Sequence, residues 1–203
     1  MARRSDHTRE ELKELILETS WDIVGLDGFE NLSARRIAGE IGYTPGTIYN
    51  LFDSMDDLYL QVNARTLTQL RMLLDDPACN HLDKAPVQNM KEMASLYIRF
   101  TQNNRKHWLM LFQHTTPDDF ELPEWFDGKI EEMFAPLERQ MRGYFSAEHQ
   151  VRQKMAARML WSSVHGLCFL QETGKIGIVR QDMSMERIAH SLIDIFIKGI
   201  EKS

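Results

Sequence analysis

Long hydrophobic runs are absent from this chain, and cysteine is scarce. No segment approaches the roughly 18 consecutive apolar residues that a membrane-spanning helix needs, so we expect no membrane partner. The two cysteines, Cys79 and Cys168, stand far apart and match no spacing of metal ligands. The sequence therefore predicts no metal site and, with no export signal read at the N-terminus, reduced thiols in the cytoplasm.

The short motifs on which many enzyme sites are built are also missing. The chain contains no HExxH zinc motif, no nucleophile elbow and no glycine-rich phosphate loop. The residues that could suggest a metal site or a thiol nucleophile are His107, His114, His165, Cys168 and Glu172. His107 and His114 are two helical turns apart, which is too far to share one metal without further ligands. We expect no enzyme and no cofactor, and metal analysis of the purified protein would test this.

Strand signals are nearly absent, and helical periodicity fills most of the chain. The best strand candidate, 176–179, contains a glycine and reads as a loop. The sequence predicts an all-α fold of about nine helices, because apolar residues recur at three- and four-residue intervals. The expected helices span 8–26, 33–41, 45–52, 54–74, 86–103, 105–114, 123–144, 147–173 and 184–202.

The charge balance argues against a protein that is basic all over. The 203 residues carry a net charge of −6, and 43% of them are hydrophobic, as in ordinary globular proteins. Residues 1–52 hold six Lys and Arg against nine Asp and Glu. Nucleic-acid binding by this segment would therefore depend on a local patch of positive charge.

The segment 28–50 has the pattern of a helix-turn-helix. Two short helices are expected on either side of Gly42, with Ser33 and Thr44 as caps and Ile48 pointing inward. The second helix exposes small or hydrogen-bonding side chains that suit phosphates and base edges, while Pro45 and Gly46 permit close approach. Two capped helices with a glycine between them also occur in ordinary helical bundles, so this geometry alone leaves both roles open.

A denser pattern lies in the same segment: Gly28-Phe29, Leu32-Ser33, Ile37-Ala38, Ile41-Gly42, Thr44-Pro45-Gly46-Thr47-Ile48-Tyr49, Phe52 and Leu58. Over about residues 8–62 the chain resembles the N-terminal domain of tetracycline-repressor (TetR) family regulators. The resemblance implies a helix-turn-helix DNA-binding domain at 1–53. It implies an effector-binding and dimerisation domain at 54–203, with helix 54–74 as the link.

The resemblance also implies which residues contact DNA. The helix that begins at Pro45 becomes the recognition helix, and Tyr49 contacts a phosphate. Arg3 and Arg4 lie on an arm that could reach the minor groove or remain a solvated terminus. Arg35 or Arg36 is expected to meet the backbone, while the other faces solvent or a carboxylate. The expected DNA-binding residues are Arg3, Arg4, Arg35, Thr44, Pro45, Gly46, Thr47, Tyr49 and Asn50.

One departure from the family pattern weakens this interpretation. The family usually has a lysine at the position of Met55, where it touches the DNA backbone. The lysine is absent here, and residues 1–52, the N-terminal head, carry more acidic than basic side chains. Both features leave open the alternative that the chain is a helical interaction protein that no longer binds DNA. The sequence also leaves open whether the regulator is a repressor or an activator.

The second half of the chain carries a weaker resemblance. The run Leu160-Trp161-Ser162-Ser163-Val164-His165-Gly166-Leu167 looks like the C-terminal subtype named for its Trp-His-Gly (WHG) signature. Gly166 inside a helix costs about 1 kcal/mol relative to alanine, and close approach of another helix would explain it. The resemblance implies a homodimer through helices 147–173 and 184–202. The expected interface residues are Trp161, Leu167, Ile188, Leu192, Ile195 and Phe196.

Methionine and aromatic residues are abundant in the same half. Such side chains line adaptable pockets, and they also fill ordinary cores. The expected pocket residues are Met93, Tyr97, Phe100, Trp108, Phe112, Trp125, Met133, Met159, His165 and Phe169. The resemblance implies a repressor that leaves a palindromic DNA operator when a small, largely hydrophobic effector binds.

Overall fold

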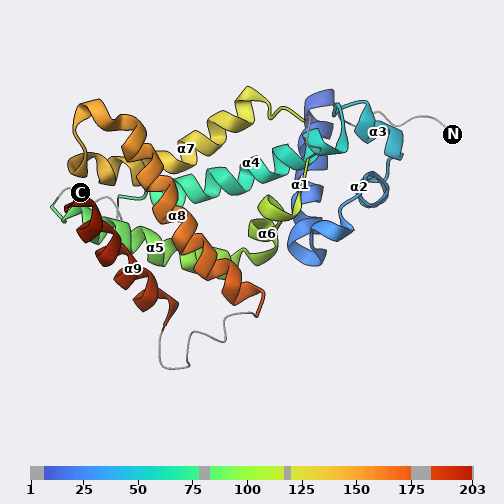
Figure 1. Cartoon of the computed structure of the whole chain (residues 1–203). Helices are drawn as coiled ribbons and strands as arrows, with labels where there is room; N and C mark the ends of the chain where they lie inside the picture. The colour runs from blue at the N-terminus through green and yellow to red at the C-terminus, as the bar shows by residue number, and fades with distance from the viewer. Residues whose placement is uncertain (1–6, 78–82, 117–119, 175–183, 203) are drawn as a thin grey trace. The chain divides into compact units, whose positions relative to one another are not determined.

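The computed structural model describes residues 7–77, 83–116, 120–174 and 184–202 (Figure 1). In this part of the chain the structure has nine α-helices and no strand, which confirms the all-α prediction. None of these helices combines the length and apolar character needed to cross a bilayer. Residues 176–179, Cys79, Arg3 and Arg4 lie outside the described residues. The helices are α1 (Arg9–Asp27), α2 (Ala34–Ile41), α3 (Pro45–Tyr49), α4 (Met55–Leu74), α5 (Pro86–Asn103), α6 (Arg105–Gln113), α7 (Glu124–Met141), α8 (Gln150–Glu172) and α9 (Met185–Ile200).

Local sequence signals fix the first helix boundaries. Thr8 forms a capping box with Glu11: its hydroxyl accepts from the Glu11 backbone N–H at 3.2 Å, and its own N–H donates to the Glu11 carboxylate at 2.7 Å. Ser33 caps α2 through its hydroxyl, which accepts from the Arg36 N–H at 3.3 Å. Gly42 ends α2 in the left-handed region, with φ 75° and ψ 25°, as glycine tolerates best.

The chain divides into two compact units by packing. The first unit contains residues 1–67 and 104–127, and the second contains 68–103 and 128–203. Helices α4 and α7 therefore contribute residues to both units. The boundary predicted at residue 53 concerns which residues bind DNA, and it stays a prediction.

In the first unit, α1 to α4 and α6 enclose one hydrophobic core. Ile16, Ile37, Ile48 and Leu58 are almost fully buried in it, together with Met110 from α6. Burying each such side chain contributes about 1.5–3 kcal/mol, before the entropy of ordering it is subtracted. Met110 makes α6 a structural part of this unit, although α5 separates it from α1 to α4 in the sequence.

Two histidines fasten α6 to its neighbours in the first unit. The His107 ring stacks on Trp21 of α1 at 3.7 Å between centroids, and its Nε2 lies 2.9 Å from the Trp21 carbonyl oxygen. Burial lowers the pKa of His107, so the neutral ring donates its N–H to that carbonyl. His114 Nε2 lies 2.9 Å from Asp56 Oδ1 of α4. These contacts use two of the histidines that a metal site would have needed.

In the second unit, α5 packs beside α9, and α8 packs against both helices (Figure 1). Lys91 of α5 pairs with Asp194 of α9 at 2.7 Å. Ser95 Oγ of α5 lies 2.8 Å from His190 Nε2 of α9. This bundle of three helices forms the frame for the cavity and the groove described below.

Candidate functional site

The short helix α3, which follows the turn after α2, exposes one of its faces to solvent. Ile48 buries its side chain in the core of the first unit, with 1% exposed, and Phe52 just after α3 does the same, with 2% exposed. The helix is thereby fixed by its inner face. On the outer face Tyr49 is 57% exposed, and Thr44, Pro45, Gly46 and Asn50 are also exposed, whereas Thr47 is half-buried. The structure thus brings the predicted contact residues of this segment together.

Thr44 occupies the cap position of α3 but makes no capping hydrogen bond. Its hydroxyl lies 3.4 Å from the Thr47 hydroxyl instead, so the prediction that Thr44 caps the helix is wrong in this detail. The two hydroxyls point toward each other at the start of α3. A pair of hydroxyls in that position suits hydrogen bonds to phosphates or base edges.

Gly46 has no packing reason to be glycine inside this protein. A Cβ built on it would meet only Thr44 Oγ1, at 3.9 Å. Its φ is not positive either, so alanine or a larger residue could adopt this backbone. The missing side chain leaves room for close approach to the backbone of the helix at this position.

The two arginines of α2 have different surroundings. Arg36 is held by two carboxylates, Asp27 at 3.1 Å and Glu40 at 3.0 Å. Arg35 is exposed and has no ion-pair partner among the residues that the structure describes. Arg35 is therefore the α2 cation that is available to a phosphate. At the start of α4, the half-buried Met55 packs on the core.

Two of the ten predicted pocket residues, Met93 and Tyr97, line a cavity in the second unit, with about 40 Å³ of free volume. His165 adjoins it through Tyr97, whose hydroxyl lies 2.9 Å from His165 Nδ1. Phe169 is 40% exposed and stacks on His165. The cavity is lined by Leu74, Met90, Met93, Ala94, Tyr97, Leu137, Leu160, Trp161, Val164 and Ile193.

The other predicted pocket residues lie elsewhere. Trp108 is fully buried in the first unit, where Phe112 and Trp125 are exposed. Phe100 and Met133 are buried in the second unit but do not line the cavity. Sequence reasoning also missed most of the lining, because leucine, valine and alanine at helical spacing look the same in a core and in a cavity wall.

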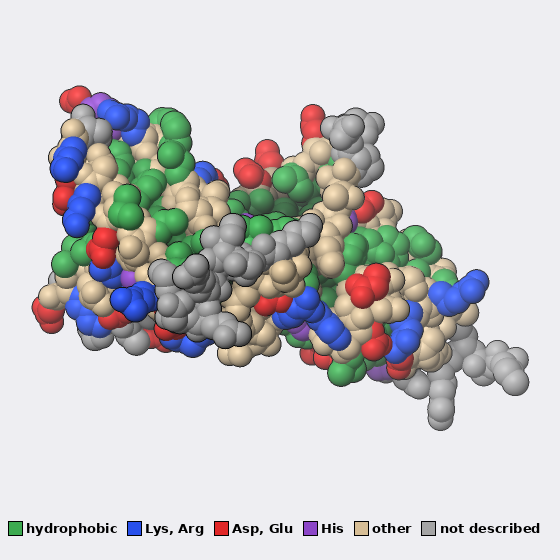
Figure 2. Space-filling model, turned by 60° about the horizontal axis from the view of Figure 1, so that its bottom comes forward, with side chains coloured by type: hydrophobic (Ala, Val, Ile, Leu, Met, Phe, Trp, Pro, Cys, Tyr) green, Lys and Arg blue, Asp and Glu red, His purple; other side chains and the backbone are tan. Residues whose placement is uncertain are grey.

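A separate groove of about 470 Å³ lies between α8 and α9. Hydrophobic side chains gather there, green at the left of Figure 2, where Figure 1 places these helices. Ile195 is 71% exposed, and Met159, which was expected in the pocket, lies in this groove with 56% exposed. The groove is lined by Phe145, Arg152, Met155, Ala156, Met159, Ile195, Phe196, Gly199 and Ile200.

Of the predicted interface residues, Ile195 and Phe196 line this groove. Leu167, Ile188 and Leu192 are half-buried, and Trp161 lines the internal cavity instead. Met155 and Ile200 of the groove are residues that the interface prediction did not include. They extend the same apolar face along α8 and α9.

A further candidate for enzyme chemistry is the thiol of Cys168. The residue is 2% exposed, and burial raises the pKa of the thiol to about 11. The thiol is therefore protonated at neutral pH and is a poor nucleophile. Within the described part of the chain, no three metal-ligating side chains converge on one point.

A short exposed helix, joined by a glycine turn to a second short helix on a packed helical unit, has the architecture of a helix-turn-helix. Residues 16–62 match the family model described as "Bacterial regulatory proteins, tetR family". Residues 90–196, more than half of the chain, match a model described as "Tetracyclin repressor-like, C-terminal domain". The chain belongs to the TetR family of DNA-binding transcriptional regulators, as the resemblance predicted. Because the C-terminal description is general, the WHG subtype stays a prediction.

Solved structures agree with this assignment in fold. A protein of unknown function from Rhodococcus sp. RHA1 is 16% identical, with a TM-score of 0.70 and 98% of each chain covered. The TetR family regulator PfmR from Thermus thermophilus is 17% identical, with a TM-score of 0.57, covering 90% of this chain and 97% of PfmR. The regulator FadR from Bacillus subtilis, in complex with stearoyl-CoA, is 12% identical, with a TM-score of 0.60, covering 92% of this chain and 98% of FadR. No curated protein sequence matches the chain.

Proposed function

We propose that this regulator is a homodimeric repressor of the cytoplasm, which reads a palindromic DNA operator with α3 and leaves it when a small hydrophobic molecule binds the second unit. One observation carries the DNA-binding part. Ile48 of α3 faces the core, whereas Thr44, Tyr49 and Asn50 face solvent. They surround Gly46, where the packing of the chain does not require a glycine. Arg35 supplies a cation beside them.

The proposed dimer uses the apolar face of α8 and α9. Met155, Met159 and Ile195 are each more than half exposed, which is unusual for side chains so close together. Gly166 and Gly199 lie within these helices, and a Cβ on either would meet nothing within 4 Å in the single chain. A mid-helix glycine costs about 1 kcal/mol relative to alanine, and a closely packed partner helix gives it a purpose. Two helices from each subunit would form a four-helix bundle.

The proposed response to a ligand rests on the internal cavity and on the family. FadR was solved with stearoyl-CoA bound, so one structural neighbour accommodates a ligand with a long apolar chain. In the present chain the lining of the cavity is apolar and contains two methionines, which adapt their shape easily. A ligand that prefers the conformation unable to bind DNA shifts the population away from the operator.

Replacing Met55 by lysine is expected to tighten operator binding by up to about tenfold at low salt. The lysine restores a cation at the start of α4 and adds one phosphate contact. The plot of the logarithm of the binding constant against the logarithm of the salt concentration is then expected to become steeper by about one unit of slope. Met55 is only half-buried, so the longer polar side chain has access to solvent. Fluorescence anisotropy with a labelled operator over a salt series measures both quantities.

The control is Met72→Lys, at a methionine of the same helix that is 67% exposed. It adds the same charge outside the DNA-binding segment and is expected to leave both affinity and slope near those of the wild type. Equal effects of the two substitutions would contradict a specific phosphate contact at the start of α4.

Transcription in vitro tests the direction of regulation. The operator is first identified by selection from a pool of random DNA duplexes. A promoter in which this operator overlaps the binding site of RNA polymerase is expected to yield less transcript as the protein is added. A promoter with one scrambled half-site serves as the control and is expected to respond weakly. An increase in transcript from the intact operator would identify an activator and overturn the repressor proposal.

A further inference from the structure

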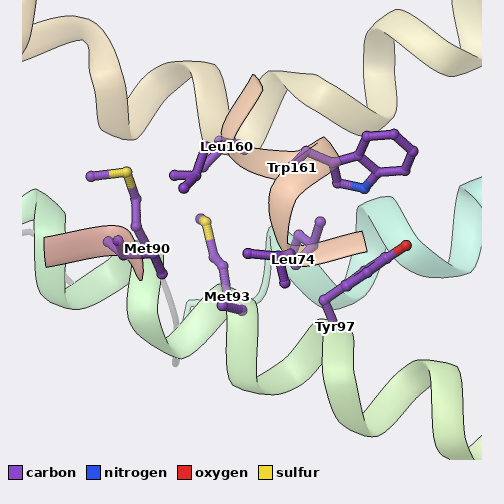
Figure 3. Close-up of a pocket in the computed structure, with 10 residues that line it drawn as sticks. Leu74, Met90, Met93, Tyr97, Leu160 and Trp161 are labelled. Carbon is purple, nitrogen blue, oxygen red and sulfur yellow. The ribbon is translucent and has the colours of Figure 1, made fainter. Parts of the chain in front are cut away.

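The internal cavity of the second unit lies between four helices. Its walls come from α5, α7, α8 and α9, with Leu74 added from the end of α4. In Figure 3, Met90 and Met93 point from α5 toward Leu160 of α8, while the hydroxyl of Tyr97 points away from the two methionines. The lining therefore offers hydrocarbon and sulfur atoms at the place where the methionines meet α8.

No lining residue carries a charge, and the nearest polar pair is already formed. The Tyr97 hydroxyl lies 2.9 Å from His165 Nδ1. The His165 ring is also stacked on Trp161, at 4.8 Å between centroids. Burial lowers the pKa of His165, so this ring is neutral at neutral pH and supplies no positive charge to an anion.

Most basic side chains on the lining helices are already held by carboxylates. Lys91 pairs with Asp194 at 2.7 Å, and Arg158 pairs with Glu138 at 2.6 Å. The same holds for Arg71, Arg99, Lys129, Arg139 and Lys154. The other cations of α8 and α9, Arg152, Arg187 and Lys198, are exposed and absent from the lining. A buried carboxylate or phosphate would therefore have to remain unpaired or to break an existing ion pair, and both are costly.

The free volume of the cavity is only about 40 Å³. Pockets for drug-sized ligands are about ten times larger. Binding must therefore enlarge the cavity. Met90 and Met93 are the lining side chains best able to yield, because each has several rotatable bonds and no branch.

We infer that the cavity on which the proposed ligand response rests takes an uncharged apolar molecule, which enters by displacing Met90 and Met93 from the space between α5 and α8. The regulatory role of this site rests on the proposed function above. The ligand class rests on the lining alone. The inference separates this chain from its neighbour FadR, whose solved ligand, stearoyl-CoA, carries phosphate groups.

Matched pairs of probes test the charge of the ligand. Isothermal titration of the full-length protein compares 1-decanol with decanoate, and naphthalene with 2-naphthoate, all below their solubility limits. The neutral member of each pair is expected to bind at least about tenfold more tightly, since the carboxylate finds no partner in the lining. Equal or tighter binding of the anions would overturn the inference, and so would a failure of both neutral probes to bind.

Two lining variants test the place of binding. Leu137→Lys adds a cation to the wall and is expected to shift the preference toward the anions, whereas Leu122→Lys, at an exposed leucine outside the cavity, is not. Met93→Ile replaces a flexible side chain by a stiff one and is expected to weaken binding of the neutral probes severalfold. Met141→Ile, at a buried methionine that does not line the cavity, is the matched control. Equal effects of Met93→Ile and Met141→Ile would overturn the proposal that the ligand enters the cavity by displacing Met93.

Operator binding is then measured with the neutral probe present. Release of the operator supports both proposals. Tight binding of the probe with unchanged operator affinity would overturn the ligand response in the proposed function, while the assignment of the cavity to an uncharged ligand would stand.

Discussion

Replacing Gly46 by glutamate is expected to weaken operator binding at least about a hundredfold, a loss of roughly 3 kcal/mol. The new side chain stands on the exposed face of α3, where it keeps the helix away from the base edges and sets a carboxylate against phosphates. The fold is expected to survive, because a Cβ at this position meets nothing closer than 3.9 Å. Anisotropy titrations with the selected operator measure the loss, and circular dichroism checks the fold.

Gly128→Glu provides the matched control. Gly128 lies in α7, and a Cβ there also meets nothing within 4 Å. The substitution makes the same change of residue and charge outside the DNA-binding segment, so we expect operator affinity close to that of the wild type. If both variants lost affinity equally, the effect would come from net charge, and α3 would lose its assigned role.

Replacing Met159 by glutamate is expected to convert the proposed dimer into a monomer and to weaken operator binding by about two orders of magnitude, because one recognition helix alone would read only half of the proposed palindrome. Met159 is 56% exposed in the single chain, so the carboxylate remains solvated in the free subunit. In a four-helix bundle the same carboxylate would be buried against apolar side chains of the partner. Light scattering coupled to size exclusion measures the mass.

The control for this variant is Met72→Glu, at a methionine of α4 with 67% exposure. It introduces the same charge on an exposed methionine away from α8 and α9. We expect it to remain dimeric and to bind the operator normally. A dimeric Met159→Glu protein would show that the face of α8 and α9 is not the interface.

The boundaries of α1 and α2 were readily predicted because their causes are local, whereas the helix expected at 45–52 already ends at Tyr49 and the one expected at 123–144 ends at Met141. Thr8 and Ser33 cap the first turns of α1 and α2 through bonds to residues only three positions away. Gly42 ends α2 by adopting a conformation that other residues avoid. Thr44 looked like an equivalent cap, yet its hydroxyl turned to the neighbouring Thr47, which shows how an equally local alternative competes with capping.

The division of the chain into packed units and the walls of the cavity could not be predicted in the same way. Met110 of α6 joins a core made by residues 16–62 and His114 meets Asp56, and neither contact leaves a periodic pattern in the sequence. Trp161 was expected at an interface and lines the cavity instead. The side of a helix that faces a cavity depends on distant partners, and the apolar stripe of α8 is broad enough to serve several of them.

Selection from a pool of random DNA duplexes tests the central claim most directly. The wild type and Tyr49→Ala are each taken through selection and sequencing at two salt concentrations. Our account predicts an enriched palindrome for the wild type, weaker at high salt and lost or weakened with Tyr49→Ala, because Tyr49 is exposed on the recognition helix. Absence of any enriched sequence for the wild type at low salt would contradict it, and would favour a helical interaction protein whose acidic head no longer reads DNA.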